Sequence, residues 1–185
     1  IKRVLLFTCV CTLAVLSTSA QTFRNKLFPS NEISGEEFKK QAINKIQSLQ
    51  NYLEVLVKND QNTSKTAKNA AVENAVRLFS DENRIVEVNS TSRPKPRKLK
   101  VRQYLVKLAF LSEKVYDKVT IRFYDVFFIS NFKKRPDGKY EAVVSMSQKF
   151  MGEGDRPYSD VVQKNIQIIL VPIQKPEGTY YEVKL

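Results

Sequence analysis

Apolar residues recur at helical spacing in the first third of the chain. Successive members are three or four positions apart and would form one face of a helix: Phe38, Ala42, Ile46, Leu49, Leu53 and Leu56. Ser34 and Glu37 stand before this face in the S-x-x-E order of a capping box. The pattern predicts a helix over residues 34–58. A second helix is predicted over 65–79, where small residues suit close packing against the first: Ala67, Ala71 and Ala75.

The period changes to two in the second half of the chain. Short β-branched residues predict a strand within 84–92, and Pro94 and Pro96 favour extended backbone in the connection that follows. A third helix can begin only after Pro96 and is expected to end near Lys114. Four longer strands are then predicted over 118–132, 140–151, 160–173 and 179–185. The first two are joined by a turn at Pro136-Asp137-Gly138.

This order of elements predicts an α+β fold. Two to three N-terminal helices would pack on a curved antiparallel sheet of four or more strands, giving a cone-like shape with a pocket between the layers. We expect a single domain over 34–185. The last residues, "TYYEVKL", alternate like a strand without a polar tail, so we expect the original chain to continue.

The first twenty residues have a different character. Lys2 and Arg3 precede an apolar run of about 13 residues, too short to span a bilayer, which needs about 20. Small residues end this run at Ala20, as in a secretory signal peptide. We therefore predict a signal peptide over 1–20, an extended lead-in over 21–33, and a periplasmic or secreted protein. An uncleaved signal anchor and a lipoprotein are the alternatives.

Both cysteines of the chain, Cys9 and Cys11, lie within this segment. The mature protein would then have no disulfide and no thiol nucleophile. The chain also contains no histidine, which excludes the common catalytic triad and histidine metal ligands. The acidic residues of the loop "GEGDRPYSD" lack the ligand spacing of a calcium loop, so we expect neither a metal site nor a cofactor.

Two segments resemble the nuclear transport factor 2-like (SnoaL-like) superfamily. "AVENAVRLFSDENRIVEV" (71–88) is similar to its second helix and first strand, and "VRQYLVKLAFL" (101–111) to its third helix. The resemblance implies a cone-shaped α+β fold. It also implies that an enzyme of this kind would carry an inward-facing Asp with a Tyr or His. The N-terminus resembles that of exported proteins from Bacteroides-type bacteria.

Asp125 is the candidate for such a carboxylate. It interrupts an apolar face of the predicted strand over 118–132, and burial among apolar neighbours would suit a general base. The alternative, which we favour, is a β-bulge near Tyr124 that turns Asp125 to solvent. Candidate ligand-binding residues are Tyr104, Tyr124 and Gln148, and Tyr116 is a further possible donor; each tyrosine could equally be a core-edge aromatic.

A basic run lies before and within the start of the third helix. Its six cations are Arg93, Lys95, Arg97, Lys98, Lys100 and Arg102. Few aromatic residues accompany them, and an exported protein would not meet nucleic acid, so we expect no nucleic-acid partner. An anionic surface is an alternative partner, because charge attraction needs no motif. The simpler interpretation is a solvated loop leading into a helix.

These observations favour a non-enzymatic, exported binding or envelope-assembly domain whose partner is a protein or a small apolar ligand. One alternative is a small-molecule binder, or an isomerase- or dehydratase-like enzyme that uses Asp125. The other is polyanion or membrane-surface binding through Arg93–Arg102. The oligomeric state does not follow from the sequence.

Overall fold

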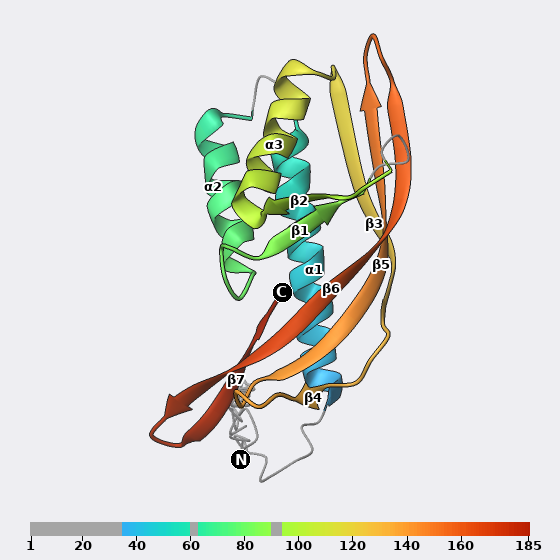
Figure 1. The fold of residues 1–185 in the computed structure, drawn as a ribbon. Helices are drawn as coiled ribbons and strands as arrows, with labels where there is room; N and C mark the ends of the chain where they lie inside the picture. The colour runs from blue at the N-terminus through green and yellow to red at the C-terminus, as the bar shows by residue number, and fades with distance from the viewer. Residues whose placement is uncertain (1–34, 60–62, 90–93) are drawn as a thin grey trace, which may run out of the picture.

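The computed structural model describes residues 35–59, 63–89 and 94–185. Within these residues three helices pack on a strongly curled antiparallel sheet, which confirms the predicted α+β, cone-like fold (Figure 1). The helices are α1 (Gly35–Val57), α2 (Lys65–Arg77) and α3 (Val101–Lys114). The main sheet contains β3 (Lys118–Phe128), β4 (Lys133–Lys134), β5 (Tyr140–Glu153), β6 (Tyr158–Lys175) and β7 (Gly178–Lys184). A separate hairpin contains β1 (Ile85–Val88) and β2 (Arg97–Lys100).

The predicted helical faces form the core. Five of the six residues on the first apolar face are buried: Ala42, Ile46, Leu49, Leu53 and Leu56. Ala71 and Ala75 are buried on α2, which packs against α1. Ser64 caps α2, because its hydroxyl accepts a hydrogen bond from the Ala67 N–H at 3.1 Å. The capping box predicted at Ser34 lies outside the described residues, as do the predicted signal peptide and lead-in.

The main sheet has the order β3-β5-β6-β7, and β4 pairs with β5. All pairs are antiparallel, so alternate residues of each strand face the helices. Among these inward residues, Val144, Ile168 and Leu170 are completely buried. Figure 1 shows the long strands β5 and β6 curving beside α1. This curvature leaves space between the first half of β6 and helix α3.

The β-bulge favoured near Tyr124 is present in β3, so the apolar alternation that begins at Val119 does not continue unbroken beyond Phe123. The pairing of β3 with β5 shifts between Tyr124 and Phe127, and Asp125 has a φ of 53° in the left-handed region. The extra residue reverses the faces. Phe127 and Ile129 are therefore exposed, whereas Val126 and Phe128 are partly buried against the core.

The basic run also differs from its prediction. Arg97–Lys100, expected as a connection and the opening of a helix, form strand β2, which pairs with β1. Helix α3 begins only at Val101, whose N–H donates to the Arg84 carbonyl at 2.9 Å. Charged side chains can occupy consecutive positions of β2, on both faces of the strand, because this small hairpin remains largely exposed.

None of the described helices is long and apolar enough to cross a bilayer.

Candidate functional site: a cavity between α3 and the sheet

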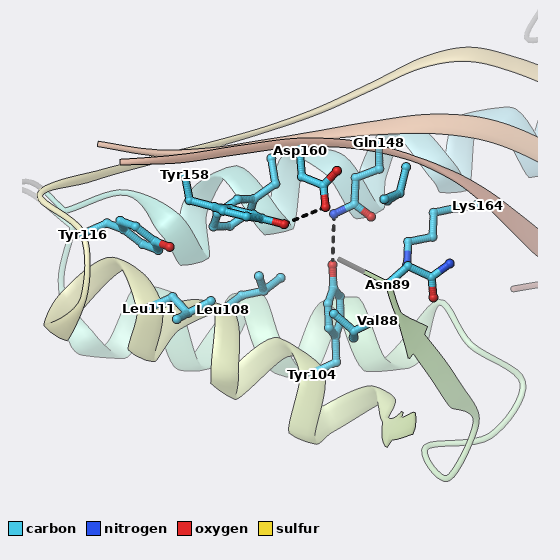
Figure 2. A pocket seen from close by; sticks show the side chains of 12 residues that line it. Val88, Asn89, Tyr104, Leu108, Leu111, Tyr116, Gln148, Tyr158, Asp160 and Lys164 are labelled. Carbon is cyan, nitrogen blue, oxygen red and sulfur yellow. Dashed lines mark hydrogen bonds between the residues drawn. The ribbon is translucent and has the colours of Figure 1, made fainter. Parts of the chain in front are cut away.

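A cavity of about 280 Å³ lies between helix α3 and the concave side of the sheet (Figure 2). We call it the smaller cavity. Its apolar lining comes from α3, from the α3–β3 connection and from β1, β5 and β6: Val88, Leu108, Leu111, Tyr116, Phe150 and Val162. Leu108 and Leu111 lie one helical turn apart, so both reach the same side of α3. The cavity has the size and apolar lining of a small-ligand site.

Aromatic rings form one end of the smaller cavity. The ring centroids of Tyr116 and Phe150 are 5.9 Å apart, and those of Phe150 and Tyr158 are 6.1 Å apart. The Tyr116 ring packs directly on the β5 backbone at Gly152, where an added Cβ would lie 2.6 Å from ring carbons. Gly152 therefore allows Tyr116 to close this end, and any larger residue would displace the ring.

Tyr104 and Gln148 meet across the cavity. Tyr104 comes from α3 and Gln148 from β5, and the Gln148 side-chain amide donates to the Tyr104 hydroxyl oxygen at 3.4 Å (Figure 2). Burial raises the pKa of Tyr104, and the hydrogen bond from Gln148 opposes that shift. The Tyr104 side chain is thus held as a neutral phenol. Since its oxygen accepts from Gln148, its own hydrogen is available for an acceptor on a ligand.

A second polar pair lies on the sheet side of the cavity. Tyr158 donates to a carboxylate oxygen of Asp160 at 2.7 Å, and both residues come from the start of β6 (Figure 2). Asp160 is only 8% exposed. Lys164 lies on the same face of β6, two residues after Val162. The smaller cavity therefore combines an aromatic end with a polar wall.

A larger cavity of about 730 Å³ adjoins the smaller one. Four residues line both: Asn89, Tyr104, Gln148 and Lys164. The larger cavity extends from this shared boundary toward the β1–β2 hairpin and also includes Arg84 and Ile166. We call the four shared residues the junction.

The structure brings together only some of the candidate residues. Tyr104, Tyr116 and Gln148 line the smaller cavity, so these predicted ligand-binding residues share one site. Tyr124 and Asp125 line neither cavity. Both are exposed, and Asp125 lies in a β-bulge, which is the interpretation that the sequence favoured. An exposed carboxylate lacks the desolvated surroundings that the general-base hypothesis assumed.

Two cations of the basic run form ion pairs with acids of the fold. Arg102 forms ion pairs with Glu73 and Glu82. Lys98 lies 3.5 Å from Glu87, and the Lys100 amine donates to the Asn83 side chain at 2.9 Å. Arg93 lies outside the described residues. The charge of Lys98 and Arg102 is therefore partly balanced within the protein, and binding of a polyanion by this run stays a prediction.

Asp160 and Lys164 line the smaller cavity without having been predicted as site residues. They stand on a face of β6 that continues as Val162, Ile166, Ile168 and Leu170, so they interrupt an apolar alternation in the same way as Gln148. Among the residues that the structure describes, no group of Asp and Glu is arranged to hold a metal ion.

Neither a protein-family model nor a curated protein sequence matches this chain. Two solved structures align with it at 10% identity. One is a provisionally assigned scytalone dehydratase from Novosphingobium aromaticivorans, with a TM-score of 0.40, covering 80% of this chain and 81% of that chain. The other is a phenazine biosynthesis-related protein from Pseudomonas aeruginosa, with a TM-score of 0.35, covering 82% of this chain and 78% of that chain. These scores are too low to carry a functional or family assignment, and the resemblance to the nuclear transport factor 2-like superfamily remains an expectation.

Proposed function

We propose that this chain binds a small, mainly apolar molecule in the smaller cavity. The observation that carries the proposal is the pairing of Gln148 with Tyr104 beside the apolar and aromatic end of this cavity. Apolar walls supply most of the binding free energy, and a few fixed polar groups select the orientation of the ligand. The Tyr104 hydroxyl would donate to an oxygen or nitrogen acceptor of that ligand.

The geometry favours binding over catalysis. The enzyme hypothesis depended on Asp125, which is exposed and lines neither cavity. The carboxylate that does line the smaller cavity, Asp160, is already hydrogen-bonded to the Tyr158 hydroxyl. Export and a role in an envelope assembly remain predictions, because they concern residues 1–34 and partners that the described chain does not contain.

A neutral fluorescent probe, N-phenyl-1-naphthylamine, tests the pocket. Its fluorescence should rise saturably with the wild-type protein, because its rings fit an apolar and aromatic site. Leu111→Trp places a larger side chain in the smaller cavity and should weaken binding at least about tenfold. Phe110→Trp is the matched control, since Phe110 is the neighbouring residue of α3 and is 54% exposed. It should bind the probe like the wild type.

Val162→Phe fills the same cavity from β6 rather than from α3. Weaker probe binding by both filling variants would therefore not be explained by a folding defect of α3 alone. Thermal unfolding followed by circular dichroism would verify that each variant is folded. Equal probe binding by the wild type, the folded filling variants and the control would place the probe elsewhere on the surface and overturn the proposal.

A further inference from the structure

Lys164 places a positive charge where the two cavities meet. Its side chain is half-buried and lines both the smaller and the larger cavity. Figure 2 shows it beside Asn89, on the far side of the Tyr104–Gln148 pair from the aromatic end. A molecule whose rings occupied the aromatic end would thus direct its other end toward Lys164.

The Lys164 amine makes its direct contact with a neutral oxygen rather than with a carboxylate. It donates to the main-chain carbonyl of Glu87. Among the described residues no carboxylate oxygen lies within ion-pair distance of this amine, although the charges of Glu87 and Asp160 do act on it. Burial lowers the pKa of Lys164 despite these two acids. An anion bound beside Lys164 would balance the positive charge of its amine.

The acids near Lys164 are engaged by other groups. The Glu87 carboxylate lies 3.5 Å from the Lys98 amine, and the Asp160 carboxylate accepts from Tyr158 at 2.7 Å. Both carboxylates thus have closer partners than the Lys164 amine, although their charges still act on it from beyond ion-pair distance.

Arg84, which lines the larger cavity, likewise donates to a neutral acceptor. One guanidinium nitrogen of Arg84 donates to the side-chain carbonyl oxygen of Gln167 at 2.6 Å, again a neutral acceptor. The acidic residue Asp81 in the same cavity accepts from the main-chain and side-chain nitrogens of Asn83. The cations that line this space thus face neutral oxygens, whereas the acids are already satisfied.

The remaining polar groups of the junction also suit an anion. Tyr104 has a hydroxyl hydrogen to donate, and Asn89 carries an amide with two donor hydrogens. Together with the Lys164 ammonium they form a set dominated by donors. Hydrogen bonds to an ionised acceptor are stronger than those to a neutral acceptor.

We propose that the ligand of this site is an amphipathic organic anion. Its aromatic or alicyclic body lies against Tyr116 and Phe150, and its carboxylate, sulfonate or phosphate group lies at the junction beside Lys164. This inference rests on the proposed binding function and names the class of molecule that the cavity takes.

Two fluorescent probes with the same ring system separate the charge from the apolar contact. 1-Anilinonaphthalene-8-sulfonate is N-phenyl-1-naphthylamine with one added sulfonate. The wild type should bind the sulfonate more tightly than the neutral probe. Lys164→Gln should weaken sulfonate binding at least about tenfold, which is the size expected for a charge-assisted hydrogen bond. Its affinity for the neutral probe should change less than about twofold.

Lys107→Gln is the matched control, because it removes the same charge from an exposed position of α3 outside both cavities. It should leave both affinities unchanged. If the neutral probe binds but Lys164→Gln does not alter the sulfonate affinity, the anion inference is overturned while the pocket stands. If neither probe responds to the cavity-filling variants, the pocket itself is wrong and the anion inference falls with it.

Discussion

Asp125 shows how one residue can support two interpretations in a pattern-based search for a site. A carboxylate within an apolar alternation predicts either a buried functional group or an irregular backbone, and the sequence supports both interpretations. The structure has the irregular backbone, with a φ of 53° at Asp125 and a register shift between Tyr124 and Phe127. Short polar side chains such as Asp tolerate this left-handed conformation better than β-branched ones.

The bulge predicts opposite effects for two substitutions at Asp125. Asp125→Gly should preserve the free energy of unfolding or raise it by up to about 1 kcal/mol, since glycine adopts positive φ without strain. Asp125→Val should lower it by about 1–2 kcal/mol, because a β-branched residue is strained there. Urea denaturation measures both. N-phenyl-1-naphthylamine binding should be the same in both folded variants, and a loss of binding in Asp125→Gly would return Asp125 to the functional site.

Gln148, Asp160 and Lys164 mark the limit of what residue patterns reveal about the cavity. Each is a polar residue on an otherwise apolar strand face, so each could be flagged from the sequence. Their proximity depends on the pairing of β5 with β6, in which Gln148 lies opposite Val162. That register places Gln148 between Asp160 and Lys164, and no local pattern specifies it.

At the scale of elements, helices were predicted more closely than the hairpin. The face of α1 is defined by spacing alone, because a helix buries residues at fixed intervals along its own sequence. Strand β2 consists of Arg97, Lys98, Leu99 and Lys100, which have no intrinsic preference for a strand. It forms because β1 provides a partner, so its existence is a tertiary effect.

The contact between α2 and α3 contains an ion pair with unequal exposure. The Lys68 amine lies 3.0 Å from a Glu113 carboxylate oxygen, and the side chains are 8% and 44% exposed, respectively. Glu113→Gln would leave the buried ammonium without its counter-charge and should lower the free energy of unfolding by about 1–2 kcal/mol. Lys68→Met removes the buried charge and keeps an unbranched apolar stem, so it should be less destabilising than Glu113→Gln.

Glu153→Gln provides the control for this prediction. Glu153 pairs with Lys118 at 3.1 Å, and both side chains are more than half exposed, so its loss should cost no more than about 0.5 kcal/mol. Urea denaturation at low and high salt would compare all three variants. The prediction is wrong if Lys68→Met proves more destabilising than Glu113→Gln, because the amine would then contribute more than it costs to bury.

For the whole molecule, the order of elements predicts the class of fold but not its cavities. Helices followed by long antiparallel strands must form layers, so an α+β arrangement follows from local patterns. The two cavities depend on the curl of β5 and β6, and also on strand β1, whose residues line part of each. The same holds for charge, because the sequence shows the basic run without the acids that pair with Lys98 and Arg102 in the fold.

The excess positive charge of the chain, +12, should therefore act over the whole surface rather than through the basic run. Replacing Lys95, Arg97, Lys98 and Lys100 with Gln removes four exposed cations from that run. The matched variant replaces four exposed lysines elsewhere: Lys40, Lys65, Lys107 and Lys114. Both variants should elute from a heparin column at similar salt concentrations, below that of the wild type, because screened attraction between exposed charges depends on their number. Much earlier elution of the basic-run variant alone would instead identify a local polyanion-binding surface at β2, which the ion pair of Lys98 with Glu87 would then be insufficient to neutralise.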